Sequence, residues 1–253
     1  MGHRRLLTLL VGLGVVALFV LGFAGAGRAE SRAPAQASGR PKPAKRAKPA
    51  KRSPTRRCRP QRPQRFLERP SFVKRGRLDG KAHTRALRYR AEKYGSVPGL
   101  GLERYNKERA FSHAKKTTFF GLPILLHEDV VPALGCVERR IQAVCRAPRE
   151  RYTPKAIGGF RQENTYRQGE VSNHLFGLAI DIDPDRNPCC GCVKPWPDNP
   201  ICKREAKSAY EQTSLPRCWI DAFERYGFYW LGHDDLKDTM HFEFLGRPER
   251  VRR

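Results

Sequence analysis

Four residues in two short segments could together bind and use a metal ion. His174 and Asp181 lie in the segment Ser-Asn-His-Leu-Phe-Gly-Leu-Ala-Ile-Asp at 172–181, and Asp238 and His241 lie in Asp-Thr-Met-His-Phe-Glu at 238–243. Two histidines and one carboxylate are typical ligands of a catalytic zinc ion, which keeps a fourth position open for water. The second carboxylate, Asp238, would then be available as a general base for that water. The cluster therefore predicts a hydrolytic site with one zinc ion.

The first segment must bend between its two candidate ligands. Residues 178–183 alternate between large aliphatic residues and a second set that includes Asp181 and Asp183, which is the period-two pattern of a half-buried strand. The acidic face of this strand would turn away from the core and towards the site. His174 is seven residues before Asp181, so a straight strand would place the two side chains on opposite faces. Gly177 can provide the bend, because glycine adopts backbone conformations that other residues resist.

The second segment repeats this logic. His241 and Glu243 alternate with three apolar residues, Met240, Phe242 and Phe244, so we expect the apolar side chains to pack while His241 faces out. Asp238 is three residues before His241, which is an odd offset along a strand. It should therefore stand in the turn that leads into the strand, where it can share the side of the metal.

These blocks resemble the D-alanyl-D-alanine carboxypeptidase-like zinc peptidases of the VanY type, a family that also includes phage L-alanyl-D-glutamate endolysins. The resemblance rests on the two segments above and on Gly-Gly-Phe-Arg at 158–161, which is similar to the block before the first zinc histidine of that family. Gly-Phe-Tyr-Trp at 227–230 also resembles the strand before the second one. The similarity covers about residues 120–246, and its ordered blocks make it more specific than one short motif.

The resemblance implies one Zn²⁺ ion bound by His174, Asp181 and His241, with Asp238 as the acidic base. It also implies a peptidoglycan stem peptide as the substrate. Cleavage as a D-Ala-D-Ala carboxypeptidase and as an L-Ala-D-Glu endopeptidase both fit these motifs, and the sequence leaves the choice open. The alternative function is a noncatalytic cell-wall-binding or scaffold protein that keeps the zinc as a structural ion. The presence of Asp238 favours the enzyme.

Two more residues near the predicted site each have two interpretations. The resemblance implies that Arg161 orients the substrate, since a guanidinium group suits a substrate carboxylate or oxyanion charge. The alternative for Arg161 is an ordinary ion pair at the end of a strand. Glu243 is on the same strand face as His241, where it would orient this ligand from behind. The alternative for Glu243 is an exposed surface carboxylate.

The first 29 residues predict export. Arg4 and Arg5 precede an apolar run at 6–23, and small residues follow up to Ala29, which is the layout of a signal peptide. The run is close to the roughly 20 residues that span a bilayer, so an uncleaved N-terminal membrane anchor is the alternative. Either interpretation places the rest of the chain outside the bacterial cytoplasm, in the periplasm, in the cell envelope or in the medium.

The next segment, residues 30–65, is predicted to be a disordered basic linker. It contains seven prolines and, apart from Glu30, no acid, so it has little apolar surface with which to fold. Residues 1–65 carry 16 Lys and Arg against one acid, which is about 15 of the formal net charge of +25. In an exported chain this arm would meet anionic envelope polymers or lipids, and no nucleic acid is expected as a partner. The alternative role is that of a solvated spacer.

Residues 66–253 have the length of a single catalytic domain. The patterns predict helices from Asp79 to about Tyr94, over 130–145 and around 219–226. Strands are expected near 154–160, 177–183, 227–231 and 240–245. The prediction is an α+β fold in which a small mixed or antiparallel sheet carries the metal ligands and packs with helices.

Eight cysteines predict disulfides if the chain is exported, although the sequence does not fix the pairs. Cys136 and Cys145 would be about 13.5 Å apart along one helix, too far for a bond. The adjacent Cys189 and Cys190 should not bond each other. We therefore expect the cysteine-rich insertion at 184–218 to be linked internally or to the helix. The alternative is a structural zinc on four cysteines, Cys189, Cys190, Cys192 and Cys202.

Overall fold

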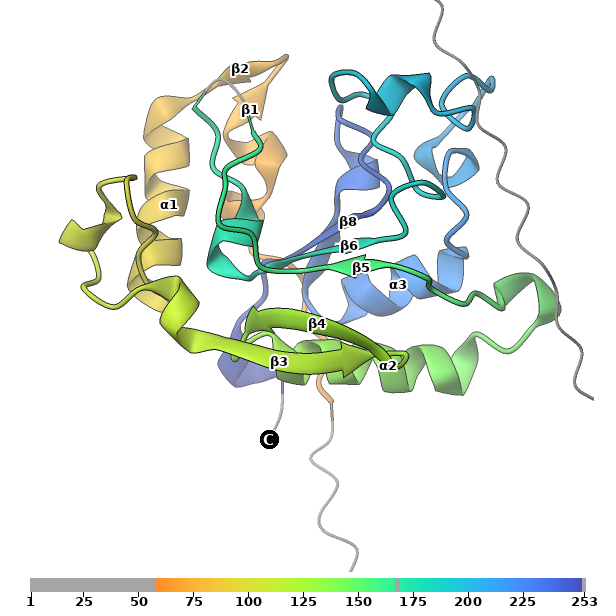
Figure 1. Ribbon diagram of the computed structural model, residues 1–253, viewed down its shortest axis with the longest axis horizontal. Helices are drawn as coiled ribbons and strands as arrows, with labels where there is room; N and C mark the ends of the chain where they lie inside the picture. The colour runs from red at the N-terminus through yellow and green to blue at the C-terminus, as the bar shows by residue number, and fades with distance from the viewer. Residues whose placement is uncertain (1–57, 167–168, 252–253) are drawn as a thin grey trace, which may run out of the picture. The chain divides into compact units, whose positions relative to one another are not determined.

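The computed structural model describes residues 58–166 and 169–251, which form an α+β domain of three α-helices and small antiparallel sheets (Figure 1). This is the predicted fold class. The predicted signal peptide and most of the predicted linker lie outside the described residues. Within the described part of the chain, no helix combines the length and the apolar character that crossing a membrane would require.

The three helices lie where the sequence patterns predict them. α1 spans Gly80–Tyr94 and begins at Asp79, whose side chain accepts hydrogen bonds from the backbone N–H groups of Lys81 and Ala82. This is a common N-terminal cap, and Gly95 follows the helix with a positive φ of 99°. α2 spans Val131–Val144 and α3 spans Arg217–Arg225.

The central sheet has the order β5-β6-β8-β7, and all of its pairs are antiparallel. Its strands are Ile157–Gly158 (β5), Ala179–Ile182 (β6), Phe228–Trp230 (β7) and His241–Phe244 (β8). Each strand is shorter than the sequence pattern predicts. Before β6, Gly177 and Leu178 lie outside the strand, and residues 173–176 form a short 3-10 helix.

Two hairpins were not predicted from the sequence. β3 (Ala114–Phe119) pairs with β4 (Leu122–His127), and β1 (Val73–Lys74) pairs with β2 (Arg77–Leu78). β3 contains two lysines and two threonines, so hydrophobic alternation does not mark it as a strand. Its two-residue turn has a positive φ at both Phe120 (47°) and Gly121 (82°), as tight hairpin turns require.

The core lies between the central sheet and helices α2 and α3. Phe223 of α3 stacks on Phe242 of β8 with ring centroids 4.2 Å apart, and Phe119 at the end of β3 packs edge-on against Phe223 at 5.6 Å. In Figure 1 the β3–β4 hairpin and α2 lie below the central sheet. One face of β8 is therefore committed to the core, and its other face is left for His241 and Glu243, as the alternation predicts.

All eight cysteines lie within the described residues and form four disulfides: Cys58–Cys136, Cys145–Cys218, Cys189–Cys192 and Cys190–Cys202. Neither of the two excluded bonds is among them, in agreement with the prediction. The insertion is linked both internally, by two bonds, and to α2, by the bond to Cys145. The alternative of a structural zinc on four cysteines is wrong for this structure, because disulfide sulfurs do not act as thiolate ligands.

The last residues of the predicted linker belong to the folded domain. The backbone N–H groups of Arg59, Gln61 and Gln64 donate to the carbonyl oxygens of Val251, Arg225 and Leu245 at 3.0, 2.9 and 2.9 Å. Cys58 adds the bond to α2. The predicted boundary at Phe66 is therefore too late. Residues 59–64 attach to the domain through their backbone and not through apolar side chains, so their proline-rich composition did not predict these contacts.

Candidate metal centre

The register of the central sheet brings two predicted ligands together. Asp181 of β6 is directly opposite His241 of β8, and side chains at opposed positions of an antiparallel pair share one face. On the other side of β6, Asp181 is opposite Gly158 of β5. A side chain at Gly158 would contact Asp181, since an added Cβ would be 3.7 Å from the Asp181 Cβ. Glycine therefore leaves space beside the carboxylate.

The third predicted ligand comes from the 3-10 helix Asn173–Phe176, which Ser172 caps by accepting a hydrogen bond from the His174 N–H. Gly177 ends this helix with φ 68°. A Cβ there would be 2.2 Å from the Phe160 ring and 2.6 Å from the backbone nitrogen of His127, so both the conformation and the close packing require glycine. The predicted bend at Gly177 is thus confirmed, and it places His174 beside Asp181.

The donor atoms of His174, Asp181 and His241 lie within 4.8 Å of one another. His174 Nε2 is 3.2 Å from His241 Nδ1 and 3.1 Å from Asp181 Oδ2, and His241 Nδ1 is 2.8 Å from Asp181 Oδ1. All three residues are buried, with at most 3% of their surface exposed. All three line the pocket described below. Asp181 and His241 therefore point away from the core, as predicted, although they are shielded from bulk solvent.

The tautomers of the two histidines suit a cation. His174 Nδ1 is 2.5 Å from the carbonyl oxygen of Gly159, which can only accept, so Nδ1 carries a proton. His241 Nε2 is 3.2 Å from Glu243 Oε1 and donates to it in the same way. In the neutral rings, the remaining nitrogens then turn their lone pairs towards each other and towards Asp181. Such a cluster of acceptors is stable only around a positive charge, and this donor set fits one zinc ion.

Charge at the centre follows the same logic. Burial alone would raise the pKa of Asp181, but the two neighbouring histidines hold this pKa well below its usual range. If no metal ion is bound, a proton on His241 Nδ1 can supply the positive charge instead: burial opposes the charged imidazole, yet its hydrogen bonds to Asp181 and Glu243 raise its pKa to about 10. Glu243 is 4% exposed, so its alternative as an exposed surface carboxylate is wrong.

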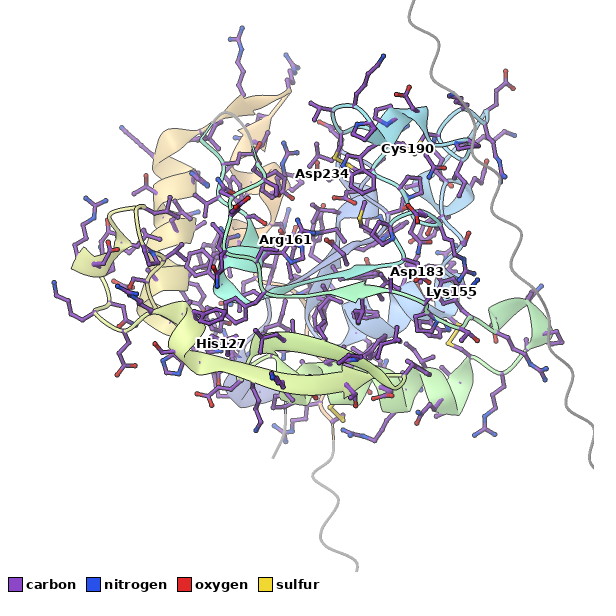
Figure 2. The ribbon with its side chains drawn as sticks, viewed as in Figure 1. His127, Lys155, Arg161, Asp183, Cys190 and Asp234 are labelled. Atoms are coloured by element: carbon purple, nitrogen blue, oxygen red, sulfur yellow. A yellow bond between two sulfur atoms is a disulfide. The ribbon has the colours of Figure 1, made fainter. Side chains whose placement is uncertain are left out.

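Asp183 does not join this site, contrary to the predicted acidic face of β6. Its carboxylate accepts hydrogen bonds from the Tyr152 hydroxyl at 2.6 Å and from the backbone N–H groups of Lys155 and Ala156 at 2.8 and 2.6 Å. Figure 2 shows Asp183 beside Lys155, apart from Arg161. β6 ends at Ile182, and Asp183 turns to φ 43°. The strict alternation of a strand therefore stops before this residue, and Asp183 holds the 152–156 loop instead.

Asp238 precedes β8 in a turn, as predicted, and it lines the same pocket as the three ligands. It is 8% exposed, and among the described residues its buried Oδ1 has no hydrogen-bond partner. Burial raises the pKa of this carboxyl to about 7. A cation held by the three ligands would lower the pKa again, because it favours the charged form. An unpaired buried carboxylate beside a metal centre is available to take a proton from a reactant.

Arg161 follows β5 and reaches the carboxylate of Asp181. Its guanidinium forms an ion pair with Asp181 and is 3.4 Å from the Thr165 hydroxyl. The side chain is 38% exposed, and it also lines the pocket. The structure therefore shows the ion pair that was the alternative interpretation, and it leaves the guanidinium accessible from the pocket.

A comparison with protein families supports a peptidase-like segment around this site. Residues 165–244 match the family model described as D-alanyl-D-alanine carboxypeptidase. The matched segment is similar to that family. It contains all three predicted ligands and Asp238, while the block at 158–161 precedes it. No curated protein and no solved structure matches the chain. The resemblance found in the sequence is confirmed over this segment, and the match supports a peptidase.

The carboxypeptidase-like segment surrounds a pocket of about 330 Å³. One wall carries the three ligands and Arg161. A second wall comes from the insertion and the turn that carries Asp238, with Cys189, Cys192, Val193, Trp196 and Leu236 among its lining residues. Val193 and Trp196 are 53% and 36% exposed, so this wall presents apolar side chains to whatever enters.

Sequence reasoning missed Arg69, which also lines this pocket. It forms two hydrogen bonds with the Glu170 carboxylate, at 2.8 and 2.9 Å, and an ion pair with Asp234 at 2.5 Å. Three segments far apart in the sequence are joined in this way at the rim of the pocket. No motif surrounds Arg69, so the sequence alone held no signal for it.

Proposed function

We propose that the protein is a zinc peptidase that hydrolyses an amide bond in the stem peptide of peptidoglycan. The observation that carries this proposal is the cluster of two histidine nitrogens and one carboxylate with their acceptor atoms turned towards each other. His174, Asp181 and His241 would hold the metal. A zinc ion at this place supplies a water that is acidic at neutral pH and polarises the carbonyl group of the substrate.

The side chains around the three ligands would provide proton transfer, substrate binding and orientation of the ligands. Asp238, buried and unpaired at Oδ1, would take the proton of the attacking water and return it to the leaving amine. Arg161 would bind a substrate carboxylate or stabilise oxyanion charge, because its side chain is 38% exposed and lines the pocket. Glu243 would fix the ring of His241 through the Nε2 hydrogen bond.

Peptidoglycan lies outside the cytoplasm, which agrees with the export proposed for this protein. Four disulfides are typical of an exported protein, and the N-terminal apolar run would direct the export. We place the mature enzyme in the periplasm or the cell envelope, or outside the cell. The basic segment before Cys58 would hold it near anionic envelope polymers or lipids.

The proposal is tested by digesting purified muropeptides with the full-length protein and identifying the products by mass spectrometry. Loss of one terminal alanine identifies a D-Ala-D-Ala carboxypeptidase, whereas a cut between L-Ala and D-Glu identifies an endopeptidase. Products should disappear when a chelator removes the metal and return when zinc is added. Intact muropeptides after incubation with the zinc-loaded protein would rule out the peptidase and favour a noncatalytic wall-binding protein.

A further inference from the structure

The first residues of the insertion lie along the turn that carries Asp238. Cys189 and Asp238 form an isolated antiparallel bridge. The N–H of Cys190 donates to the Lys237 carbonyl at 3.2 Å, and the N–H of Gly191 donates to the Leu236 carbonyl at 2.6 Å. Three consecutive residues of the insertion thus contact three consecutive residues of the turn.

This contact is close enough to exclude a side chain. A Cβ on Gly191 would be 2.4 Å from the Asp235 carbonyl oxygen and 2.6 Å from that of Leu236, which is closer than non-bonded atoms approach. The Cys189 Sγ is 3.4 Å from the same Leu236 oxygen. A displacement of Gly191 or of the Cys189 side chain would therefore displace the turn.

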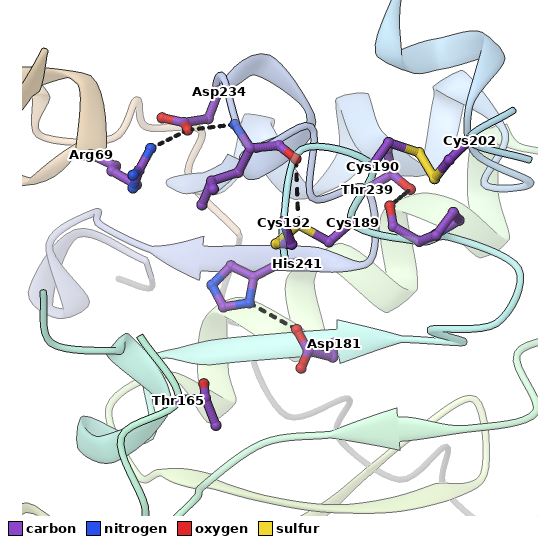
Figure 3. Close-up of a disulfide and its surroundings, with 12 residues drawn as sticks. Arg69, Thr165, Asp181, Cys189, Cys190, Cys192, Cys202, Asp234, Thr239 and His241 are labelled. Atoms are coloured by element: carbon purple, nitrogen blue, oxygen red, sulfur yellow. Dashed lines mark hydrogen bonds and ion pairs between the residues drawn. A yellow bond between two sulfur atoms is a disulfide. The ribbon is translucent and has the colours of Figure 1, made fainter. Parts of the chain in front are cut away.

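The disulfide between Cys189 and Cys192 also lies close to the side chain of Asp238. The two sulfur atoms and a carboxylate oxygen of Asp238 all lie within 4.8 Å of one another. Figure 3 shows Cys189 and Cys192 near His241, with the Cys190–Cys202 disulfide farther from it. Since Oδ1 of Asp238 has no hydrogen-bond partner among the described residues, packing against its neighbours must hold this carboxylate.

We propose that the Cys189–Cys192 disulfide is a positioning element for Asp238, acting through the turn and through its place beside the carboxylate. This inference rests on the proposed function, in which Asp238 is the general base. The Cys190–Cys202 disulfide closes a twelve-residue separation within the insertion and does not line the pocket. Only the Cys189–Cys192 bond is therefore expected to affect catalysis. Displacing the general base should lower turnover and leave substrate binding nearly unchanged.

The test compares two double variants of the full-length protein, Cys189→Ala with Cys192→Ala and, as the matched control, Cys190→Ala with Cys202→Ala. Zinc content, thermal unfolding, kcat and KM on muropeptides, and hydrogen exchange of the 231–240 peptide are measured for both. We expect the first variant to keep zinc, to lose about 10- to 100-fold in kcat with little change in KM, and to exchange faster in 231–240. The control should keep its kcat and its exchange pattern.

A third variant, Gly191→Ala, keeps both disulfides and displaces the turn by contact alone. It should reproduce the loss of kcat and the faster exchange even if the first variant fails to fold. Equal kcat losses in the two double variants, or unchanged exchange in 231–240 when Cys189 and Cys192 are replaced, would overturn the inference. Exchange does not depend on turnover, so it decides this point even if no muropeptide is cleaved, an outcome that would count against the proposed function alone.

Discussion

The two walls of the pocket are held in place by different kinds of interaction. The ligand wall is built from β6 and β8, whose register fixes Asp181 opposite His241, and its side chains are buried and hydrogen-bonded to one another. The insertion wall contains no strand of the central sheet, and disulfides and contacts with the 234–238 turn hold it. Metal binding on the first wall should therefore survive changes that alter the second.

The largest effect is expected from breaking the ligand wall. Replacing His174 or His241 by Ala should remove zinc and abolish hydrolysis, because two remaining ligands bind zinc poorly. Elemental analysis of the purified variants measures the metal directly. His113→Gln serves as the matched control, since His113 pairs with two surface glutamates away from the pocket. Full zinc occupancy in both alanine variants would refute the ligand assignment.

A smaller loss is expected from Asp238→Asn, which keeps the shape of the side chain but cannot accept the proton. Zinc should be retained, because Asp238 is outside the three-ligand cluster, while hydrolysis should fall by about 10²- to 10⁴-fold. Steady-state kinetics and metal analysis on the same sample check both parts. If hydrolysis stays near normal, the base is elsewhere, and Glu243 is the next residue to test.

The difference between the walls also explains what the sequence could predict. Residues of the ligand wall are close in sequence to the strands that carry them, so alternation and the bend at Gly177 were enough to place His174, Asp181 and His241. Asp183 was misplaced because alternation was extended one residue beyond the end of β6. The predicted sheet and helices follow from the same local patterns.

Long-range contacts could not be predicted in this way. Arg69 joins the pocket through Glu170 and Asp234, which are far from it in the sequence. The four disulfides represent one of 105 possible pairings, and only geometry in three dimensions selects among them. The backbone contacts of 59–64 leave no mark in composition. The insertion wall is therefore the part of the site that needed a structure.

Reduction should affect the insertion wall first. Mass mapping of the non-reduced protein should recover the four disulfides, with no bond between Cys136 and Cys145. A mild thiol reductant should then speed hydrogen exchange in 184–218 more than in β6 and β8, and activity should fall while zinc is largely retained, because disulfides limit the conformations of a loop with little packing of its own. Loss of zinc in step with activity would show that the two walls are not independent. Eight free thiols in protein recovered from the envelope would refute the disulfide assignment.

The smallest effect is expected from Trp196→Ala, which changes the insertion wall without touching the metal or the base. Trp196 is 36% exposed, whereas Trp219 and Trp230 are at most 2% exposed. If the substrate lies along this wall, the variant should raise KM by about tenfold, equivalent to about 1.4 kcal/mol, with little change in kcat. The unequal exposure of the three indoles gives a second measurement. In the Asp238→Asn protein, a bound muropeptide should protect Trp196 from an added fluorescence quencher, and Val193→Ser serves as a comparison that keeps the indole. An unchanged KM together with unprotected fluorescence would place the substrate entirely on the ligand wall.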